Sequence, residues 1–146
     1  MLDPILDENP LSGASVELGR PALHRAVSAN NVSMTRLLLD RGADSRRLDS
    51  NGQTALHLAV DVGSERIITA MLEKKVDVNA KDTLGRTALY RAVLNENEKI
   101  TRMLLDAKVD VNSRDAFGEV VLHLAVEKGL ETFVFLLLSH GADIEA

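Results

Sequence analysis

The sequence contains no cysteine, so disulfide bonds and thiolate metal sites are excluded. Aromatic residues make up only 3% of its 146 residues, fewer than a globular fold closing around a single core normally uses. A basic excess is also absent: the net charge of −5 disfavours a general nucleic-acid-binding protein. The longest run of large apolar residues, Phe133–Leu138, is far shorter than the roughly 20 residues that span a membrane. The acidic start lacks the basic and apolar segments of a signal peptide, so we expect a cytoplasmic protein, with the nucleus as the alternative.

The chain does contain one phrase that occurs four times. Each copy begins 33 residues after the one before: GRPALHRAV from Gly19, GQTALHLAV from Gly52, GRTALYRAV from Gly85 and GEVVLHLAV from Gly118. A unit of this length cannot bury its own core, so such units must stack on one another. An open stack offers a long surface and no enclosed cavity, which favours binding over catalysis.

Apolar residues recur in the same columns of the four copies. The aligned sets are Leu23, Leu56, Leu89 and Leu122; Ala26, Ala59, Ala92 and Ala125; Val27, Val60, Val93 and Val126; Leu38, Met71, Leu104 and Leu137; and Leu39, Leu72, Leu105 and Leu138. An aspartate stands three residues before the glycine of the last three copies: Asp49, Asp82 and Asp115. This register predicts a core built from close-packed helices.

Each copy reads as two short helices joined by a turn. In the second copy, Thr54 is placed to cap the first helix, whose apolar residues follow at helical spacing until Gly63 ends it. The second helix carries an apolar face at Ile67, Ile68 and Met71. A stretch rich in turn-forming residues then leads into the next copy.

These motifs resemble the ankyrin repeat. Its Thr-Pro-Leu-His signature appears as TALH at Thr54–His57, TALY at Thr87–Tyr90, PALH at Pro21–His24 and VVLH at Val120–His123, and its Gly-Ala-Asp appears at Gly42 and Gly141. The resemblance implies an all-α repeat fold, a solenoid of stacked helix-turn-helix units with β-hairpin fingers. We expect residues 1–15 to form an N-terminal tail or cap and residues 16–146 to form the repeat domain, divided as 16–48, 49–81, 82–114 and 115–146.

The chain departs from the ankyrin pattern at positions that matter for stability. Pro21 and Val120 replace the capping threonine, and each replacement removes a cap that contributes about 1 kcal/mol. Lys75 and Lys108 stand where the family has glycine after the second helix, and a left-handed conformation there costs about 1 kcal/mol.

Nothing in the sequence indicates an enzyme, a cofactor or a metal. His24, His57 and His123 fall in one column, and stacked helices at roughly 8–10 Å would keep them too far apart to share a zinc ion. The recurring aspartates are interpreted as turn-forming. Asn79 and Asn112 resemble the asparagines hydroxylated in some ankyrin proteins, but a hairpin-forming role is favoured.

The resemblance implies that a partner binds the concave face, made of finger tips and first helices. The matching residues are Leu18, Arg20, Leu48, Asn51, Gln53, Asp61, Val62, Lys81, Leu84, Arg86, Leu94, Asn95, Arg114, Phe117, Glu119 and Lys128. Leu18, Leu84 and Phe117 share a finger-tip column, where they either pack finger to finger or form a binding ridge. Lys81, Arg86 and Arg114 could supply charge pairing to an acidic partner segment.

The expected function is a protein–protein interaction module whose partner is another protein or peptide segment, with neither nucleic acid nor membrane. The alternative is a regulatory ankyrin fragment of a larger multidomain protein, docked onto a catalytic or effector domain of the same chain. Phe135 occupies a solvent-facing column that holds Arg36, Thr69 and Arg102 in the other copies. We therefore also expect weak self-association through the Phe135 face.

Overall fold

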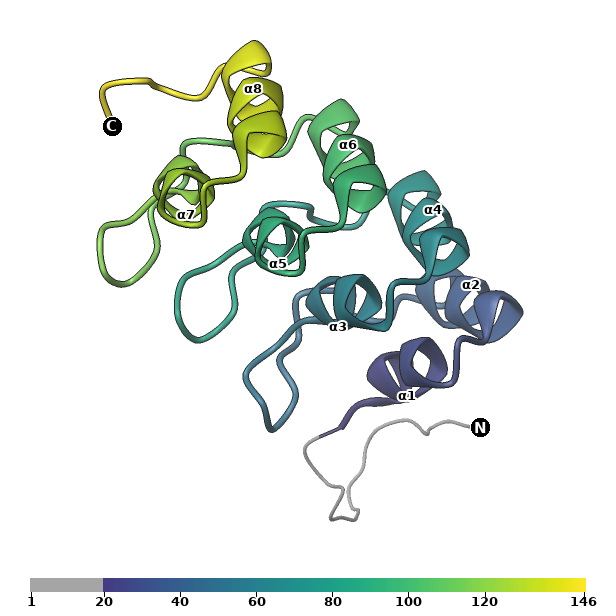
Figure 1. The fold of residues 1–146 in the computed structure, drawn as a ribbon. Helices are drawn as coiled ribbons and strands as arrows, with labels where there is room; N and C mark the ends of the chain where they lie inside the picture. Colours follow the sequence, from purple (N-terminus) through teal and green to yellow (C-terminus); the bar gives the residue numbers. More distant parts are fainter. Residues whose placement is uncertain (1–19) are drawn as a thin grey trace. The chain divides into compact units, whose positions relative to one another are not determined.

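The computed structural model describes residues 20–146, and these form eight α-helices and no β-strand (Figure 1). The helices are α1 (Ala22–Ser28), α2 (Val32–Asp40), α3 (Ala55–Val62), α4 (Glu65–Glu73), α5 (Ala88–Leu94), α6 (Glu98–Asp106), α7 (Val121–Glu127) and α8 (Glu131–Ser139). Each of the four copies contributes one helix pair, numbered here as repeats 1 to 4. The predicted all-α repeat architecture is confirmed.

The helices belong to two compact units, Met1–Val76 and Asp77–Ala146. In unit 1, α1 packs against α3 and α2 against α4, so the first helices form one layer and the second helices another (Figure 1). Unit 2 is built in the same way, with α5 against α7 and α6 against α8. Each unit is therefore a stack of two repeats.

Four of the five predicted apolar columns supply core residues, whereas the fifth is half-buried at Leu39, Leu72 and Leu138. In all four repeats the leucines of the first column are at most 6% exposed and the alanines at most 7%: Leu23, Leu56, Leu89, Leu122, Ala26, Ala59, Ala92 and Ala125. On the second helices, Met71, Leu104 and Leu137 are fully buried. Val27, Val60 and Val93 are at most 2% exposed. The fourth member of that column, Val126, is 61% exposed.

Side chains cap four of the eight described helices, α2, α3, α4 and α6. Thr54 Oγ1 accepts the His57 amide at 3.3 Å, which confirms the predicted cap of α3. The second helices α2, α4 and α6 are capped in the same manner by Asn31, Ser64 and Asn97. These caps satisfy amides that the first helical turn leaves without a backbone partner.

Thr87, which matches Thr54 in the third copy, is the N-cap residue of α5, but its side chain accepts no amide hydrogen bond and so does not cap the helix. The reason lies three residues further on. In α3, the Thr54 hydroxyl is held by the ring Nδ1 of His57 at 2.6 Å. The equivalent residue in α5 is Tyr90, which has no ring nitrogen to orient the Thr87 hydroxyl.

Replacing the threonine by Pro21 affects more than the cap of α1. Pro21 makes no side-chain cap, as expected, and the buried Nδ1 of His24 has no hydrogen-bond partner among the described residues. In α3 that ring atom pairs with the threonine hydroxyl. The start of α7 differs again, because His123 Nδ1 accepts a hydrogen bond from the amide of Val120 at 3.1 Å. The first helix of repeat 1 therefore lacks a side-chain cap, and His24 lacks a partner at Nδ1 among the described residues.

We expect Pro21→Thr to be more stable than Pro21→Val by about 1 kcal/mol, since only threonine supplies the hydroxyl for the helix amide and for His24. Valine is the matched control, because it has the same branched shape and also lacks the proline ring. Thermal unfolding followed by circular dichroism measures the difference. Equal melting temperatures for the two variants would show that the missing hydroxyl has no cost.

Two lysines adopt the left-handed backbone conformation that the sequence predicted. Lys75 has φ 61° and Lys108 has φ 67°, while the same column holds Gly42 and Gly141 in the end repeats. Neither lysine side chain makes a hydrogen bond or ion pair within the described residues. These positions therefore carry strain that no side-chain contact offsets.

The double variant Lys75→Gly and Lys108→Gly should be more stable by about 1 kcal/mol per site, because glycine adopts this conformation without a Cβ clash. Its melting temperature should rise by about 3 °C per kcal/mol. The double alanine variant keeps the Cβ and should show no such gain. A glycine variant no more stable than the alanine one would contradict the strain argument.

Candidate functional site

The projecting loops before α3, α5 and α7 share one construction, and we call them fingers (Figure 1). In each, the amide of the recurring aspartate donates to the carbonyl four residues on: Asp49 to Gln53, Asp82 to Arg86 and Asp115 to Glu119, all at 2.9 Å. The aspartate Oδ1 also accepts two amides of the finger. The turn-forming interpretation of these aspartates is confirmed. The expected β-hairpin fingers are corrected to closed turns without strand pairing, because each finger is closed by the aspartate and its own amides.

The finger tips take their orientation from this closure. The amides of Asn51, Leu84 and Phe117 donate to the aspartate two residues earlier, each at 2.9 Å. These bonds hold the tip backbone against the aspartate, and the side chains of Leu84 and Phe117 are 43% and 66% exposed. Packing between fingers therefore leaves much of both apolar side chains open to solvent.

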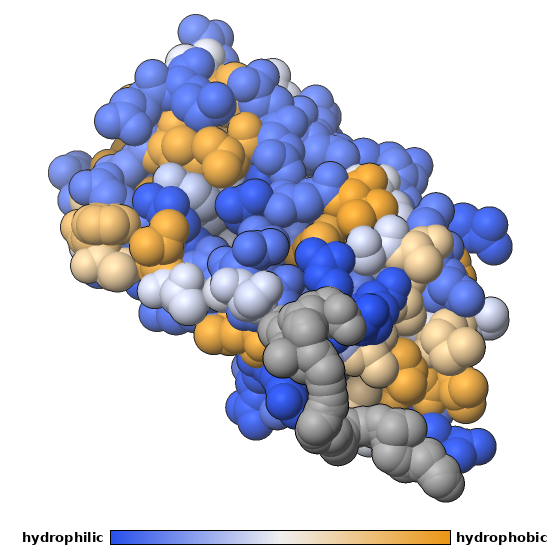
Figure 2. Space-filling model, turned by 90° about the horizontal axis from the view of Figure 1, so that it is seen from below, coloured by the Kyte–Doolittle hydropathy of each residue, from blue (hydrophilic) through white to orange (hydrophobic). Residues whose placement is uncertain are grey.

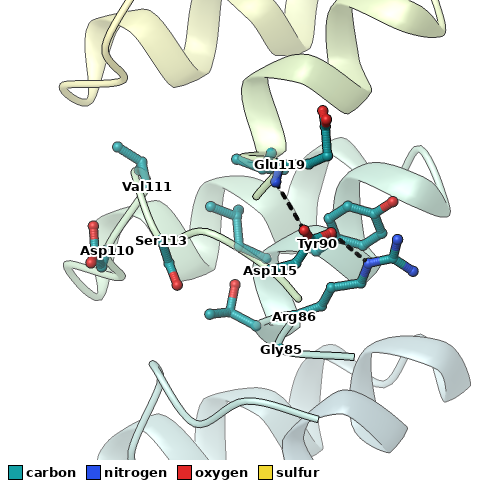
Figure 3. A pocket seen from close by; sticks show the side chains of 11 residues that line it. Gly85, Arg86, Tyr90, Asp110, Val111, Ser113, Asp115 and Glu119 are labelled. Atoms are coloured by element: carbon teal, nitrogen blue, oxygen red, sulfur yellow. Dashed lines mark hydrogen bonds and ion pairs between the residues drawn. The ribbon is translucent and has the colours of Figure 1, made fainter. Parts of the chain in front are cut away.

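The two fingers of unit 2 are bonded to each other. The amide of Ala116 donates to the carbonyl of Leu84 at 2.9 Å, and Lys81 Nζ donates to the carbonyl of Arg114 at 3.2 Å. Arg86 Nε lies 3.1 Å from Asp115 Oδ2 and forms an ion pair with it (Figure 3). These contacts fix Leu84 and Phe117 at a set spacing on neighbouring repeats.

Arg86 is the centre of this arrangement. Its guanidinium lies 4.2 Å from the centre of the Tyr90 ring and 5.7 Å from that of Phe117, so it contacts an aromatic ring from each repeat. Tyr90 stands in the column that is otherwise histidine, and its substitution was the signal in the sequence that could have marked this site. Figure 3 shows Arg86, Tyr90, Asp115 and Glu119 around the small cleft between repeats 3 and 4.

The prediction that Lys81, Arg86 and Arg114 all offer charge to a partner needs revision. Arg86 pairs with Asp115, whose side chain is only 3% exposed, so its charge is offset within the fold. Lys81 and Arg114 are exposed and donate to backbone carbonyls, which leaves their charge available. Arg86 is accordingly a positioning residue for the tips.

The Asp115 carboxylate is held ionised by its surroundings. Burial alone would raise its pKa, but the amides of Glu119 and Phe117 and the Arg86 guanidinium outweigh that effect and lower the pKa below its ordinary value. The carboxylate therefore stays charged well into the acidic range and keeps the two fingers joined.

The structure divides the other predicted contact residues by exposure. The exposed ones are Leu48, Asn51, Asp61, Val62, Lys81, Leu84, Asn95, Arg114, Phe117, Glu119 and Lys128. The half-buried ones are Arg20, Gln53, Arg86 and Leu94. Leu18 lies outside the described residues. In unit 1, Gln53 Nε2 donates to Asp61 at 3.3 Å, and in unit 2 Lys128 pairs with Glu96 at 3.4 Å.

The histidines occupy separate local networks. His24 Nε2 lies 2.8 Å from the Gln53 carbonyl, His57 contacts Thr54, and His123 lies 2.9 Å from Glu119 Oε1. Burial lowers the pKa of His24, against the opposite effects of the Gln53 carbonyl and Asp49, which favours the neutral form of the ring. Within residues 20–146 no three potential ligands gather where a metal ion could bind.

Stacked helix pairs with projecting, aspartate-closed fingers define a repeat protein of the ankyrin type. A family model described as "Ankyrin repeats (3 copies)" matches residues 4–82 and 76–146, and the chain belongs to this family. Ankyrin repeats generally act as protein-interaction modules, and the ankyrin fold is a non-enzymatic one. None of the described helices has the length and apolar character needed to cross a membrane.

A 42-residue part of the chain, 29% of its length, is 55% identical to a segment of the potassium channel AKT3 of Oryza sativa subsp. japonica. That segment spans only 5% of the length of the channel. The similarity therefore concerns the repeat and not the rest of the channel.

Proposed function

We propose that the protein binds a protein partner through the finger ridge of unit 2, defined as Lys81, Leu84, Arg114 and Phe117. The observation that carries this proposal is the exposure of Leu84 and Phe117, at 43% and 66%, on two fingers bonded to each other. Aromatic side chains and arginine are enriched among the anchors of protein interfaces, and this ridge supplies Phe117 and Arg114. Because the fingers are already fixed, binding would cost little ordering entropy.

The ridge favours an extended acidic segment with apolar side chains as its partner. Leu84 and Phe117 come from successive repeats, so one segment could contact both. Lys81 and Arg114 flank them with positive charge, and neither forms an ion pair with a carboxylate of residues 20–146. Binding should therefore weaken as salt is raised. Arg86, whose guanidinium lies close to the rings of Tyr90 and Phe117, would hold Phe117 in place.

We expect the double variant Leu84→Glu and Phe117→Glu to bind at least about thirtyfold more weakly, since buried anchors often contribute 2 kcal/mol or more. The immobilised wild-type chain first identifies the bound protein by mass spectrometry. Titration calorimetry with that purified protein then compares the variants. Melting should change little, because both side chains are exposed.

The control is the double variant Thr69→Glu and Thr132→Glu, which adds the same charge at exposed positions of α4 and α8. It should bind like the wild type. If the ridge variant stays folded and binds with unchanged affinity, the ridge is not the binding surface. If it unfolds, the conservative pair Leu84→Ser and Phe117→Ser repeats the measurement without added charge.

A second candidate function is docking onto another domain of a longer polypeptide. It is favoured by the similarity to one segment of a potassium channel that is much longer than this chain. Under this proposal the protein captured by the ridge is encoded by the same gene as the repeats. A captured protein from a different gene would favour the first candidate.

A further inference from the structure

The ring of His123, near the start of α7, has two different neighbours at one nitrogen atom. The backbone amide of Val120 donates a hydrogen bond to Nδ1 at 3.1 Å, and Glu119 Oε1 lies 2.9 Å from the same nitrogen. An amide N–H needs an unprotonated Nδ1 as its acceptor, whereas a carboxylate oxygen needs a proton on Nδ1. A single protonation state of the ring therefore cannot satisfy both neighbours.

Two changes in the repeated columns create this competition. In α3 the Thr54 hydroxyl lies 2.6 Å from His57 Nδ1, and a hydroxyl can donate or accept as the ring requires. Val120 stands in the threonine column and has no hydroxyl, so its backbone amide bonds to the ring instead. Glu119 stands in a column that holds Arg20, Gln53 and Arg86 in the other copies. Both neighbours of the ring belong to repeat 4, so the competition for Nδ1 depends on no other repeat.

We infer that His123 is a proton switch in the finger before α7. The neutral ring accepts the Val120 amide at its unprotonated Nδ1 and gives no hydrogen bond to the Glu119 carboxylate. The protonated ring donates from Nδ1 to Glu119 in a charge-assisted hydrogen bond, and the Val120 amide loses its acceptor. Histidine is the side chain whose charge ordinarily changes between about pH 5 and pH 8, which sets the range of the test.

Glu119 is the charge that answers this proton. The other charged or titratable groups on α7, on the helices packed against it and in the two fingers are Glu127 on α7, Tyr90 and Arg91 on α5, Glu131 on α8, and Arg86, Arg114 and Asp115 in the fingers. None of these groups forms a hydrogen bond or ion pair with His123. Within residues 20–146, His123 is also the only ion-pair partner of Glu119.

The switch sets the charge beside the finger ridge. Glu119 closes the same finger that carries Phe117: its amide donates to Asp115 Oδ1 and its carbonyl accepts the Asp115 amide, both at 2.9 Å (Figure 3). While His123 is neutral, the exposed Glu119 carboxylate repels the acidic segment that we propose as the partner. Protonation of His123 offsets that charge, so binding should tighten as the pH falls. This consequence rests on the proposed function, whereas the switch itself does not.

NMR of the full chain without a partner, between pH 8 and pH 5.5, tests the switch. At pH 8 the ring nitrogen shifts of His123 should show an unprotonated Nδ1. As the pH falls, the Val120 amide proton should shift with the same midpoint as the ring, because this amide loses its acceptor. Val120→Thr is the matched control. Its hydroxyl can pair with Nδ1 in both states, as Thr54 does with His57, so the amide of residue 120 should no longer follow the ring.

Titration calorimetry with the captured and purified partner protein tests the link to the ridge. Between pH 8 and pH 5.5 the wild type should gain about threefold more affinity than His123→Gln, which cannot be protonated; this is the size expected for one exposed charge pair. The control is His140→Gln, because His140 lies 3.7 Å from Asp106 at the end of α8 and away from this finger. Its pH dependence should match that of the wild type.

Three results would overturn the inference. A proton on Nδ1 at pH 8 would mean that the neutral ring already donates to Glu119. A Val120 amide that stays fixed while the ring titrates would mean that the amide does not depend on the ring. Equal pH dependence of affinity in the wild type and His123→Gln would remove the link to the ridge. Unchanged binding by the Leu84→Glu and Phe117→Glu variant contradicts only the proposed function, because the NMR titration of His123 needs no partner.

Discussion

Replacing Gly85 by alanine should destabilise the protein by about 3 kcal/mol or more, the largest effect we expect from one added methyl group. Gly85 has φ +75°, where a Cβ is already unfavourable, and its Cβ would lie 2.8 Å from the backbone nitrogen of Ala116. The nearest atoms belong to the backbone of Asp115 and Ala116, which cannot rotate away from the added Cβ as a flexible side chain can. The two fingers of unit 2 must separate, which weakens the bond from Ala116 to Leu84.

Gly118 is the matched control for this prediction. It occupies the same column with φ +79°, but a Cβ there meets nothing within 4 Å. Gly118→Ala should therefore cost only about 1 kcal/mol for the backbone conformation. Urea unfolding of both variants measures the difference. Equal losses would mean that the close approach of the fingers contributes nothing.

Asp115→Ala should cost about 3 kcal/mol, since it leaves two finger amides and the Arg86 guanidinium without their acceptor. Asp115→Asn keeps an oxygen for the amides and loses the charge, so it should be destabilised less. Chemical denaturation at pH 7 gives both values. A loss below 1 kcal/mol for the alanine variant would contradict the role assigned to this carboxylate.

The pH dependence follows from the direction of the pKa shift. The folded pKa of Asp115 lies below the ordinary value of 3.8, so its ionised form stabilises the fold fully above that value. This contribution is lost as the pH falls through the lowered pKa. The wild type should lose more stability than Asp115→Asn between pH 5 and pH 2.5, bringing their unfolding free energies together. A constant gap over that range would exclude the ionised carboxylate as the cause.

The repeat period allowed the helix pairs and the buried columns to be predicted, because each column meets the same neighbours in every unit. It also indicated the left-handed lysines, since their column is glycine elsewhere. The period also placed Leu84 and Phe117 at finger tips, but it left open whether they pack finger to finger or form a ridge, because their exposure depends on the neighbouring finger.

The remaining features depend on contacts between columns or between repeats, which a single column of aligned letters does not contain. Thr87 keeps the capping residue type but lacks the ring that orients the hydroxyl of Thr54. The sequence predicted that the Arg86 charge would be available to a partner, yet Arg86 pairs with Asp115, which is 29 residues away in the chain. Hydrophobic colour on the side seen in Figure 2 forms separate patches among hydrophilic surface, so no single stripe marks one site there.

The hydrogen bond from Ala116 to Leu84 joins amide and carbonyl groups from different repeats. Its amide proton can exchange with solvent when the neighbouring fingers part, even while each finger keeps its own turn. The hydrogen-exchange rate of this single proton, followed by NMR, therefore reports how often the two neighbouring fingers separate. A ligand that contacts both tips should slow this exchange, because it holds the fingers together. A ligand that contacts only one tip should leave the exchange rate unchanged.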